Sequence, residues 1–417
     1  MTERFWAPVA AQFGKGDDNL SMVKEYGELK LGPRILLGPG PSDVDPRVLR
    51  ALSAPTIGHL DPDFIAVMND TVELLRYVFQ TENQLTLPMS GTGSAGMETV
   101  LVNLIEPGDR VIICIAGLFG QRMAEIAARC GAMVEVVQTP WGRIIEPEEV
   151  RKAFAKGPSK LLAIVQAETS TGVLQPLDEI IRLAHDNGAL VVVDAVTSIG
   201  GVELRVDDWG IDACYGGTQK CLSCPPGLAP VTLNEAARRV VTGRRTKVQS
   251  WYLDLNMIQN YWGQERFYHH TAPVNMIYAL REGLRLVQAE GLAERYARHR
   301  RNAEALHAGL AAMGLALAAQ EGHRLPSLTT VAVPSGVDEA RVRLDLLNGF
   351  GIEIGGGLGE LKGKVWRVGL MGYSSTRRNV ILFLSALEAA LRAQSFRVPA
   401  GAGAAAAEEY YAASRRD

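Results

Sequence analysis

The sequence predicts an α/β protein: a large domain with a mostly parallel central sheet flanked by helices, followed by a small α+β domain. Two observations support this fold class. Between residues 85 and 233, short apolar runs alternate with segments whose apolar residues recur at helical spacing. Such alternation is typical of parallel sheets built with right-handed crossovers. Beyond residue 287, short strands and helices mix, which is the pattern of an α+β domain.

Shifts in composition suggest the domain boundaries. Residues 1–35 are polar and irregular, and we expect them to form an N-terminal arm. The large, ligand-binding domain is expected over 36–286 and the small C-terminal domain over 287–397. Residues 398–417 are rich in alanine and glycine, which predicts a poorly ordered, disordered tail.

Each element is predicted from its apolar spacing and its flanking turn residues. In the large domain, strands are expected over 85–89, 111–115, 134–137, 161–166, 190–194, 211–215 and 228–233. Helices are expected there over 45–52, 64–79, 97–105, 117–130, 146–154, 177–187 and 274–290. After a helix over 292–313, strands are expected over 328–333, 352–354 and 364–370, and helices over 338–350 and 377–394.

Composition and charge limit the expected partners. The residues are 47% hydrophobic and 21% charged, as in ordinary soluble enzymes, and the net charge of −3 does not suggest nucleic acid or an anionic membrane. No apolar stretch is long enough for a membrane span, and residues 1–15 lack the apolar region of a secretory signal. Five cysteines suggest no disulfide scaffold, so we expect a reducing cytoplasm. Cys221 and Cys224 lack a second pair at zinc-site spacing, so no metal is expected.

Two predicted buried strands lead to one carboxylate and one lysine. The run 191–193 ends in Asp194, and the run 211–215 is followed by Lys220 among small residues. In open α/β sheets, ligands bind at the carboxyl ends of the strands, where both side chains would lie. This pair suggests pyridoxal phosphate, with the lysine holding its aldehyde as a Schiff base and the carboxylate keeping its pyridine nitrogen protonated. The alternative is a helix-capping Asp194 and a surface Lys220.

A glycine-rich turn lies between the strand 85–89 and the next helix. The turn, Ser90-Gly91-Thr92-Gly93-Ser94-Ala95-Gly96, would present the free N–H groups of a helix N-terminus to an anion such as phosphate. It also matches the GxGxxG of dinucleotide-binding proteins, but no acidic residue ends the next strand, 111–115, as that motif requires. The turn therefore predicts a phosphate cradle, or else a tight turn without a ligand.

Further positions suggest contacts to a flat, anionic ligand. Phe119 follows the strand 111–115, where an aromatic ring can stack on a cofactor or pack in the core. Ser170 lies in a hydroxyl-rich loop that suits polar contacts to a cofactor. Arg367 lies in an apolar strand, where a partly buried guanidinium needs an anion, either a substrate carboxylate or a salt-bridge partner. Gly40 belongs to a stiff Gly/Pro loop that allows close approach of the backbone to a ligand.

Together these motifs resemble those of class V (PLP fold type I) aminotransferases, in particular the alanine–glyoxylate and serine–pyruvate aminotransferase group. The resemblance covers about residues 35–394. Two positions depart from it: Ser94 stands where the group often has His, and Phe119 where it often has Trp. It rests on Leu37-Gly38-Pro39-Gly40-Pro41-Ser42, Ser90-Gly91-Thr92-Gly93, Glu168-Thr169-Ser170-Thr171-Gly172-Val173-Leu174-Gln175-Pro176, Val193-Asp194, Gln219-Lys220, Tyr268-His269-His270-Thr271 and Lys364-Val365-Trp366-Arg367-Val368-Gly369.

The resemblance implies a role for each candidate residue. Lys220 and Asp194 would be catalytic, as the Schiff-base lysine and the partner of the pyridine nitrogen of pyridoxal 5'-phosphate. Arg367, helped by the backbone near Gly40, would bind the substrate carboxylate. The remaining cofactor-binding residues would be Thr92, Gly93, Ser94 and Gln219 near the phosphate, Ser170 at a cofactor oxygen, Phe119 and Val196 against the ring, and Tyr268 and Thr271 reaching the phosphate in the other subunit. This last contact implies a homodimer with shared active sites.

The implied reaction is transamination between a small amino acid, alanine or serine, and a 2-oxo acid, glyoxylate or pyruvate. Lys220, displaced by the substrate amine, would act as the general base that moves the proton from Cα. Alternatives are a lyase on the same fold or an aminotransferase for a different donor. A desulfurase would need a nucleophilic cysteine on a mobile loop, and no cysteine follows Cys224. A non-catalytic nucleotide- or phosphate-binding protein and a dehydrogenase are the other rivals.

Overall fold

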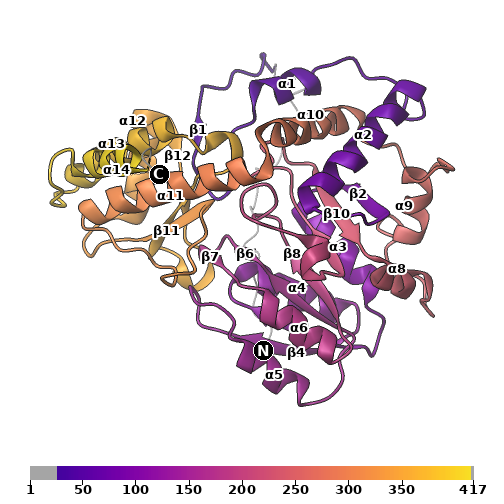
Figure 1. Cartoon of the computed structure of the whole chain (residues 1–417). Coiled ribbons are helices and arrows are strands. Elements are labelled where there is room, and N and C mark those ends of the chain that lie inside the picture. The colour runs from indigo at the N-terminus through magenta and orange to yellow at the C-terminus, as the bar shows by residue number, and fades with distance from the viewer. Residues whose placement is uncertain (1–25, 415–417) are drawn as a thin grey trace, which may run out of the picture. The chain divides into compact units, whose positions relative to one another are not determined.

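A seven-stranded sheet forms the centre of the structure, a computed structural model that describes residues 26–414 (Figure 1). Only β10 runs antiparallel to its two neighbours, so the expectation of a mostly parallel sheet is confirmed. The strand order is β2 (Leu85–Ser90), β10 (Leu228–Leu233), β9 (Ala213–Tyr215), β8 (Leu190–Asp194), β5 (Leu161–Val165), β3 (Arg110–Ile115) and β4 (Met133–Gln138).

Residues 26–33 belong to a separate N-terminal unit. Residues 26–33 contain no helix or strand, and the chain from Arg34 onward forms a second unit that contains every element described below. Most of the arm expected over 1–35 lies outside the described residues. No helix in the described part of the chain combines the length and the apolar character needed to cross a bilayer.

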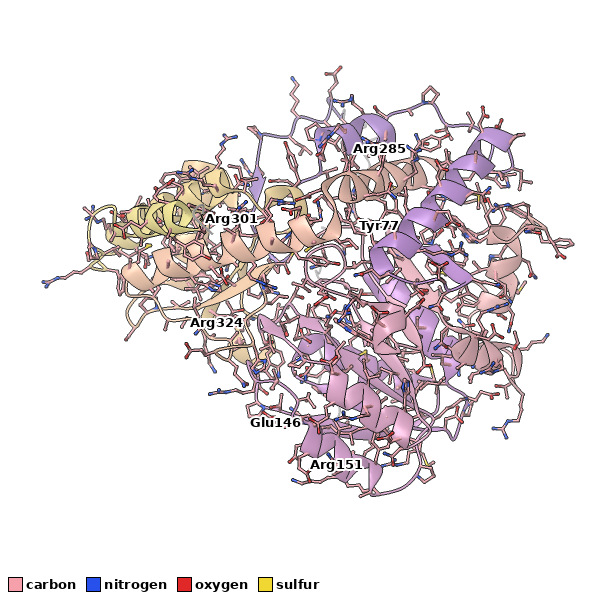
Figure 2. The ribbon with its side chains drawn as sticks, in the orientation of Figure 1. Tyr77, Glu146, Arg151, Arg285, Arg301 and Arg324 are labelled. Carbon is pink, nitrogen blue, oxygen red and sulfur yellow. The ribbon has the colours of Figure 1, made fainter. Side chains whose placement is uncertain are left out.

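Helices connect and cover the strands of the sheet. They are α1 (Pro46–Leu52), α2 (Pro62–Phe79), α3 (Gly93–Leu104), α4 (Leu118–Arg129), α5 (Pro147–Phe154), α6 (Asp178–Asp186), α7 (Val206–Trp209), α8 (Glu235–Thr242), α9 (Leu255–Trp262) and α10 (Val274–Glu290). On their outer faces, Arg151 of α5 and Arg285 of α10 each pair with a glutamate three residues earlier, at 3.1 and 2.7 Å (Figure 2). Inward-facing apolar side chains of helices and strands form one large buried cluster.

Helix α3 begins four residues before the predicted start at Met97. Thr92, in extended conformation, is the N-cap residue, so Gly93 to Gly96 are already helical. Gly96 lets this first turn of α3 pack close to the sheet, because a Cβ there would lie 3.0 Å from the Cβ of Ala229 on β10. The glycine turn therefore places the helix N-terminus directly after the end of β2.

The C-terminal part of the chain has its own sheet and its own buried cluster. The three strands are antiparallel, in the order β11 (Leu328–Ala332), β14 (Val365–Gly369) and β13 (Gly355–Gly356). Helices α11 (Leu292–Ala312), α12 (Glu339–Phe350) and α13 (Arg377–Ala393) supply much of the cluster, while β12 (Ile352–Glu353) pairs in parallel with β1 (Ile35–Leu36). The predicted boundary at residue 286 falls inside α10, so one continuous helix spans it.

The expectation of a disordered tail over 398–417 is wrong for most of that segment. Residues Ala402–Ala413 form helix α14, in which Ala407 and Tyr411 are buried. Alanine has the highest helix propensity, and α14 packs closely on α11, where a Cβ on Gly309 would lie 2.7 Å from the carbonyl oxygen of Gly403. The Tyr411 hydroxyl donates to Asn302 Oδ1 of α11 at 2.8 Å.

Candidate active site

Lys220 and Asp194 both lie at the carboxyl edge of the central sheet, as the sequence predicts. Asp194 is the last residue of β8, and Lys220 lies in the turn that follows β9. Both are buried. The lysine side chain lies against Gly40, where a Cβ would come within 2.5 Å of Nζ, and only glycine suits the φ of +110° there. Lys220 Nζ donates to the carbonyl of Pro39.

The Asp194 carboxylate is held by two donors. The backbone N–H of Val196 donates to Oδ1 and the hydroxyl of Tyr215 donates to Oδ2, both at 2.9 Å. Burial raises the pKa of Asp194 to about 7, although these two hydrogen bonds oppose the change. Tyr215 was not singled out from the sequence, because a tyrosine in an apolar strand carries no local mark of its role.

The Lys220 amine has a pKa lowered to about 8, mainly by burial and secondly by the positive charge of Arg367. A lowered pKa favours the neutral, nucleophilic amine near neutral pH. The turn that contains Lys220, here called the lysine turn, is also held by Ser42, whose Oγ donates to the carbonyl of Lys220 at 2.7 Å.

Six further predicted residues line one cavity of about 130 Å³ together with Lys220 and Asp194. Two lining residues, Met97 and Arg122, were not predicted. Thr92, Gly93 and Ser94 come from the first turn of α3, whose N–H groups are available to an anion. The six predicted residues are Thr92, Gly93, Ser94, Phe119, Val196 and Gln219.

Ser170 lies beside this cavity rather than in its lining. Its Oγ accepts from the backbone N–H of Leu118 at 3.0 Å and donates to Glu168 at 2.5 Å. Glu168 in turn accepts from the N–H of Phe119 at 3.2 Å. Burial raises the pKa of Glu168. Ser170 and the unpredicted Glu168 therefore hold the start of α4, and with it the Phe119 ring.

Arg367 is buried on β14. Its Nε donates to the carbonyl of Gly356 at 2.8 Å and its Nη1 to the carbonyl of Thr169 at 3.2 Å. Burial lowers the pKa of Arg367 to about 10, which still leaves the guanidinium charged at neutral pH. No carboxylate within the described residues lies within ion-pair distance, so the salt-bridge alternative is not the one found.

Tyr268 and Thr271 do not line the cavity of their own chain. The Tyr268 side chain is 60% exposed, and its hydroxyl lies 3.5 Å from Thr271 Oγ1. Within one chain, the structure does not bring these two residues together with the other candidates.

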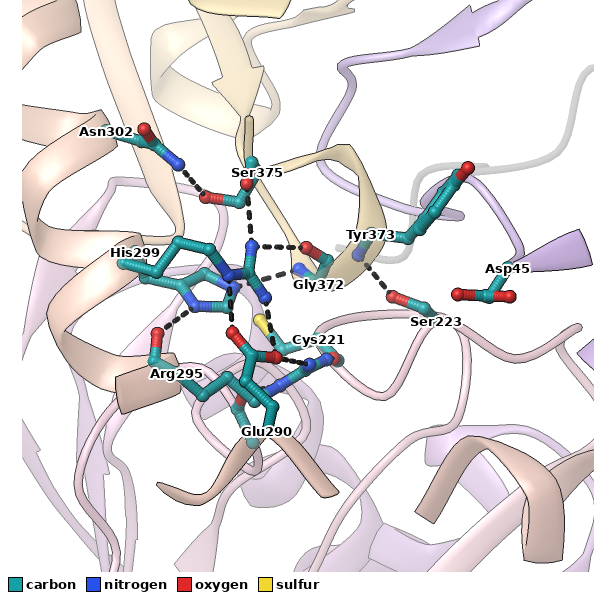
Figure 3. A network of polar contacts seen from close by, with 12 residues as sticks. Asp45, Cys221, Ser223, Glu290, Arg295, His299, Asn302, Gly372, Tyr373 and Ser375 are labelled. Atoms are coloured by element: carbon teal, nitrogen blue, oxygen red, sulfur yellow. Dashed lines mark hydrogen bonds and ion pairs between the residues drawn. The ribbon is translucent and has the colours of Figure 1, made fainter. Parts of the chain in front are cut away.

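A buried polar network lies behind the lysine turn (Figure 3). Arg295 of α11 donates from Nη2 to the carbonyl of Cys221 at 2.5 Å and from Nε to the carbonyl of Gly200 at 2.8 Å. Its Nη1 pairs with Glu290 at 2.6 Å. Because Cys221 follows Lys220 directly, Arg295 fixes the backbone next to the lysine. Cys221 and Cys224 are themselves buried free thiols.

The same network reaches the turn that follows the strand of Arg367. Arg298 pairs with Glu290 at 2.5 Å and donates to the carbonyls of Gly372 and Ser375 at 2.9 and 2.6 Å. His299 Nε2 accepts from the N–H of Gly372 at 2.9 Å. Burial lowers the pKa of His299 to about 3, so the ring is neutral and can accept this bond. No local sequence pattern marks these residues.

The cavity fits pyridoxal phosphate on two observations. Gln219 Oε1 is buried without a hydrogen-bond partner in the described residues, and the amide, turned over, would offer Nε2 as a donor to a phosphate. A Cβ on Gly93 would lie 2.9 Å from Val196 Cγ2, so glycine is required where the helix start meets the floor of the cavity. A primary amine, a carboxylate and a helix N-terminus thus face one space.

The fold and these residues fit an enzyme that binds pyridoxal phosphate. A model of the family Aminotransferase class-V matches residues 38–375, and the chain belongs to this family. It is accordingly a pyridoxal-phosphate-dependent aminotransferase of fold type I.

Two curated relatives cover most of the chain. It is 44% identical over 396 residues to the (S)-ureidoglycine–glyoxylate transaminase of Bacillus subtilis (strain 168), covering 91% of this chain and 95% of that protein. It is 43% identical over 368 residues to the alanine–glyoxylate aminotransferase of Callithrix jacchus, covering 87% and 89%. The crystal structure of ureidoglycine–glyoxylate aminotransferase from Bacillus subtilis matches with a TM-score of 0.91 at 46% identity. The match covers 93% of this chain and 100% of that one.

Proposed function

We propose that this aminotransferase moves the amino group of a small amino acid, alanine or serine, to glyoxylate. The products are glycine and the 2-oxo acid of the donor, and pyruvate is a second possible acceptor. The observation that carries the proposal is the convergence of Lys220, Asp194 and the first turn of α3 on one cavity. Both relatives named above act on glyoxylate, which supports it as the acceptor.

Each of three site residues has a separate role in the proposed reaction. Pyridoxal phosphate, when bound, supplies an aldehyde that condenses with amines and a ring that takes up electron density. The buried carboxylate of Asp194 keeps a proton on the pyridine nitrogen. Lys220, with its lowered pKa, accepts the proton from the substrate Cα and returns it. Arg367, which has no carboxylate partner among the described residues, holds the substrate carboxylate.

A second donor is favoured by one specific comparison. The Bacillus subtilis relative, at 44% identity, is named for (S)-ureidoglycine. That compound also carries a carboxylate for Arg367 and an amine for the cofactor. The same site residues therefore serve either donor, and the choice depends on the side-chain end of the pocket.

Assembly and organisation form part of the proposal. We propose a homodimer in which the exposed Tyr268 and Thr271 reach the phosphate end of the partner's cavity. The large domain would span 36–286 and supply Lys220, and the small domain would span 287–397 and supply Arg367. A reducing cytoplasm suits the five cysteines, all of which are buried free thiols.

The test is a donor comparison with the full-length holoenzyme. Alanine, serine and (S)-ureidoglycine are each mixed with glyoxylate, and the glycine formed is measured. Glycine production from alanine or serine supports the main proposal, and production from (S)-ureidoglycine alone supports the second. No glycine from any of the three would contradict the choice of glyoxylate as acceptor.

A further inference from the structure

Arg122 of α4 lines the cavity but has no role in the reaction described above. Its Nη1 donates to Ser94 Oγ at 2.9 Å, and its guanidinium carbon lies 5.1 Å from the centre of the Phe119 ring. One contact comes from the first turn of α3, and the other from the start of α4 itself. Together they hold the guanidinium at the wall of the cavity.

The charge of Arg122 is uncompensated. Among the described residues it makes no ion pair, whereas its neighbour Arg129 on the same helix pairs with Glu125 at 2.8 Å. Contact with the Phe119 face and one hydroxyl satisfies only part of a guanidinium, which has five N–H donors. Donors therefore remain for an anion in the cavity.

A cation in this cavity would stabilise a phosphate ester beyond what the N–H groups of α3 supply. The ester carries between one and two negative charges at neutral pH, and burying such a group without a counter-charge is strongly unfavourable. Lys220 and Arg122 are the basic side chains among the described lining residues. Because the Lys220 amine would be engaged at the aldehyde of a bound cofactor, Arg122 is the cation that would remain for the phosphate. Ser94, which holds Arg122, belongs to the turn whose N–H groups face an anion.

We infer that Arg122 binds the phosphate group of the cofactor and that Ser94 orients its guanidinium for this contact. The inference rests on the dependence on pyridoxal phosphate and is independent of the donor and the acceptor. The competing explanation is a structural one, in which Arg122 only stacks on Phe119 and so shapes the ring side of the cavity.

Two ligands that differ only in the phosphate separate these explanations. Full-length apoenzyme is titrated with pyridoxal phosphate and, separately, with pyridoxal, and tryptophan fluorescence gives each Kd. For Arg122→Gln we expect a Kd for pyridoxal phosphate raised about 10- to 100-fold, as for a lost charged hydrogen bond, with the Kd for pyridoxal unchanged.

Two further variants sharpen the result. Arg122→Lys keeps the charge but not the planar fork, so we expect an intermediate Kd for pyridoxal phosphate. Ser94→Ala keeps the backbone N–H and loses only the hydroxyl that holds Arg122, so we expect a smaller rise in the same direction. Arg122 is half-buried on a surface helix, and circular dichroism checks that each variant is folded.

Equal weakening of both ligands by Arg122→Gln would overturn the inference in favour of the structural role, and so would an unchanged Kd for pyridoxal phosphate. Failure of the proposed function looks different. In that case the wild-type holoenzyme forms no glycine from glyoxylate, whatever the outcome of the binding titrations.

Discussion

Two neighbouring groups of charged residues in this enzyme, one buried and one partly buried, are compensated differently. In the candidate active site, Lys220 and Asp194 form no ion pair among the described residues, and burial moves the pKa of the lysine down to about 8 and that of the aspartate up to about 7. Behind the lysine turn, Glu290 pairs with Arg295 at 2.6 Å and with Arg298 at 2.5 Å. Burial acts on Glu290 too, but its hydrogen bond to Arg298 and the two positive charges bring its pKa below the ordinary value.

The unpaired charges suit catalysis, whereas the paired charges hold the backbone in place. Where a buried charge lacks a partner, its protonation state is easily changed, which general acid–base and nucleophilic catalysis require. Where buried or partly buried charges are paired, they stay charged, and the arginines act as fixed hydrogen-bond donors to the backbone, here at the carbonyls of Cys221 and Gly372. The five predictions below test this contrast.

The largest effect is expected for Lys220→Ala. If Lys220 has both proposed roles, removing the amine removes the Schiff-base group and the base for the Cα proton, so glycine formation from alanine and glyoxylate should fall at least about a thousand-fold. The exposed Lys247→Ala is the matched control and keeps wild-type rates. If Lys220→Ala retained transamination, the assignment of the active site would be wrong.

The sharpest contrast is in stability. In urea unfolding of the apoenzyme at pH 7, Arg295→Met should lower the free energy of unfolding by about 3 kcal/mol, because Glu290 and two carbonyls lose a buried donor. Lys220→Met should instead raise it by about 1 kcal/mol or more, since it removes a charge that the folded state disfavours. Equal losses in both variants would remove the distinction between the two groups.

For Arg367→Gln we expect the KM for alanine to rise about 10- to 100-fold, because a charged bidentate contact to the carboxylate is lost. Arg367→Lys keeps the charge and should lie between the variant and the wild type. Steady-state kinetics measure both. A fall confined to kcat, with KM unchanged, would place Arg367 in another role.

The pKa of Lys220 predicts a pH dependence of known sign. Its amine titrates at about 8 in the folded protein and at 10.5 when unperturbed. The unfolded state therefore binds more protons between these values, and this group makes the apoenzyme more stable as pH rises through that window. The rate of pyridoxal capture should level off above about pH 8. In Arg367→Gln this profile moves to higher pH, whereas a profile that climbs beyond pH 10 in the wild type would refute the lowered pKa.

The smallest effect is expected at the edge of the supporting network. Tyr411→Phe removes the donor to Asn302 Oδ1, which should cost about 1 kcal/mol of stability. Asn302 also donates to Ser375 Oγ at 3.0 Å, so the loss should leave the lysine turn in place and activity unchanged (Figure 3). Thermal unfolding and glycine formation measure the two effects, and a large loss of activity would extend the active site to α14.

The α/β fold, the strand positions and the meeting of Asp194 with Lys220 follow from the sequence alone. Apolar periodicity is a local property, and parallel strands bring their carboxyl ends to one edge whatever lies between them. The glycine turn after β2 is also predictable from the sequence, because glycines between an apolar run and a helical pattern are typical of a tight strand-to-helix turn.

Only the tertiary structure decided which distant side chains support these groups. Arg122 reaches Ser94 across 28 positions, and Arg295 reaches Cys221 across 74, so no local pattern signals either contact. Helix α14 is likewise decided by tertiary structure. Its Ala-rich sequence has no strong apolar face, and the helix depends on packing against α11. Secondary structure depends mainly on local sequence. The pairing of a buried charge depends on residues that are distant in sequence and become neighbours only in the folded protein.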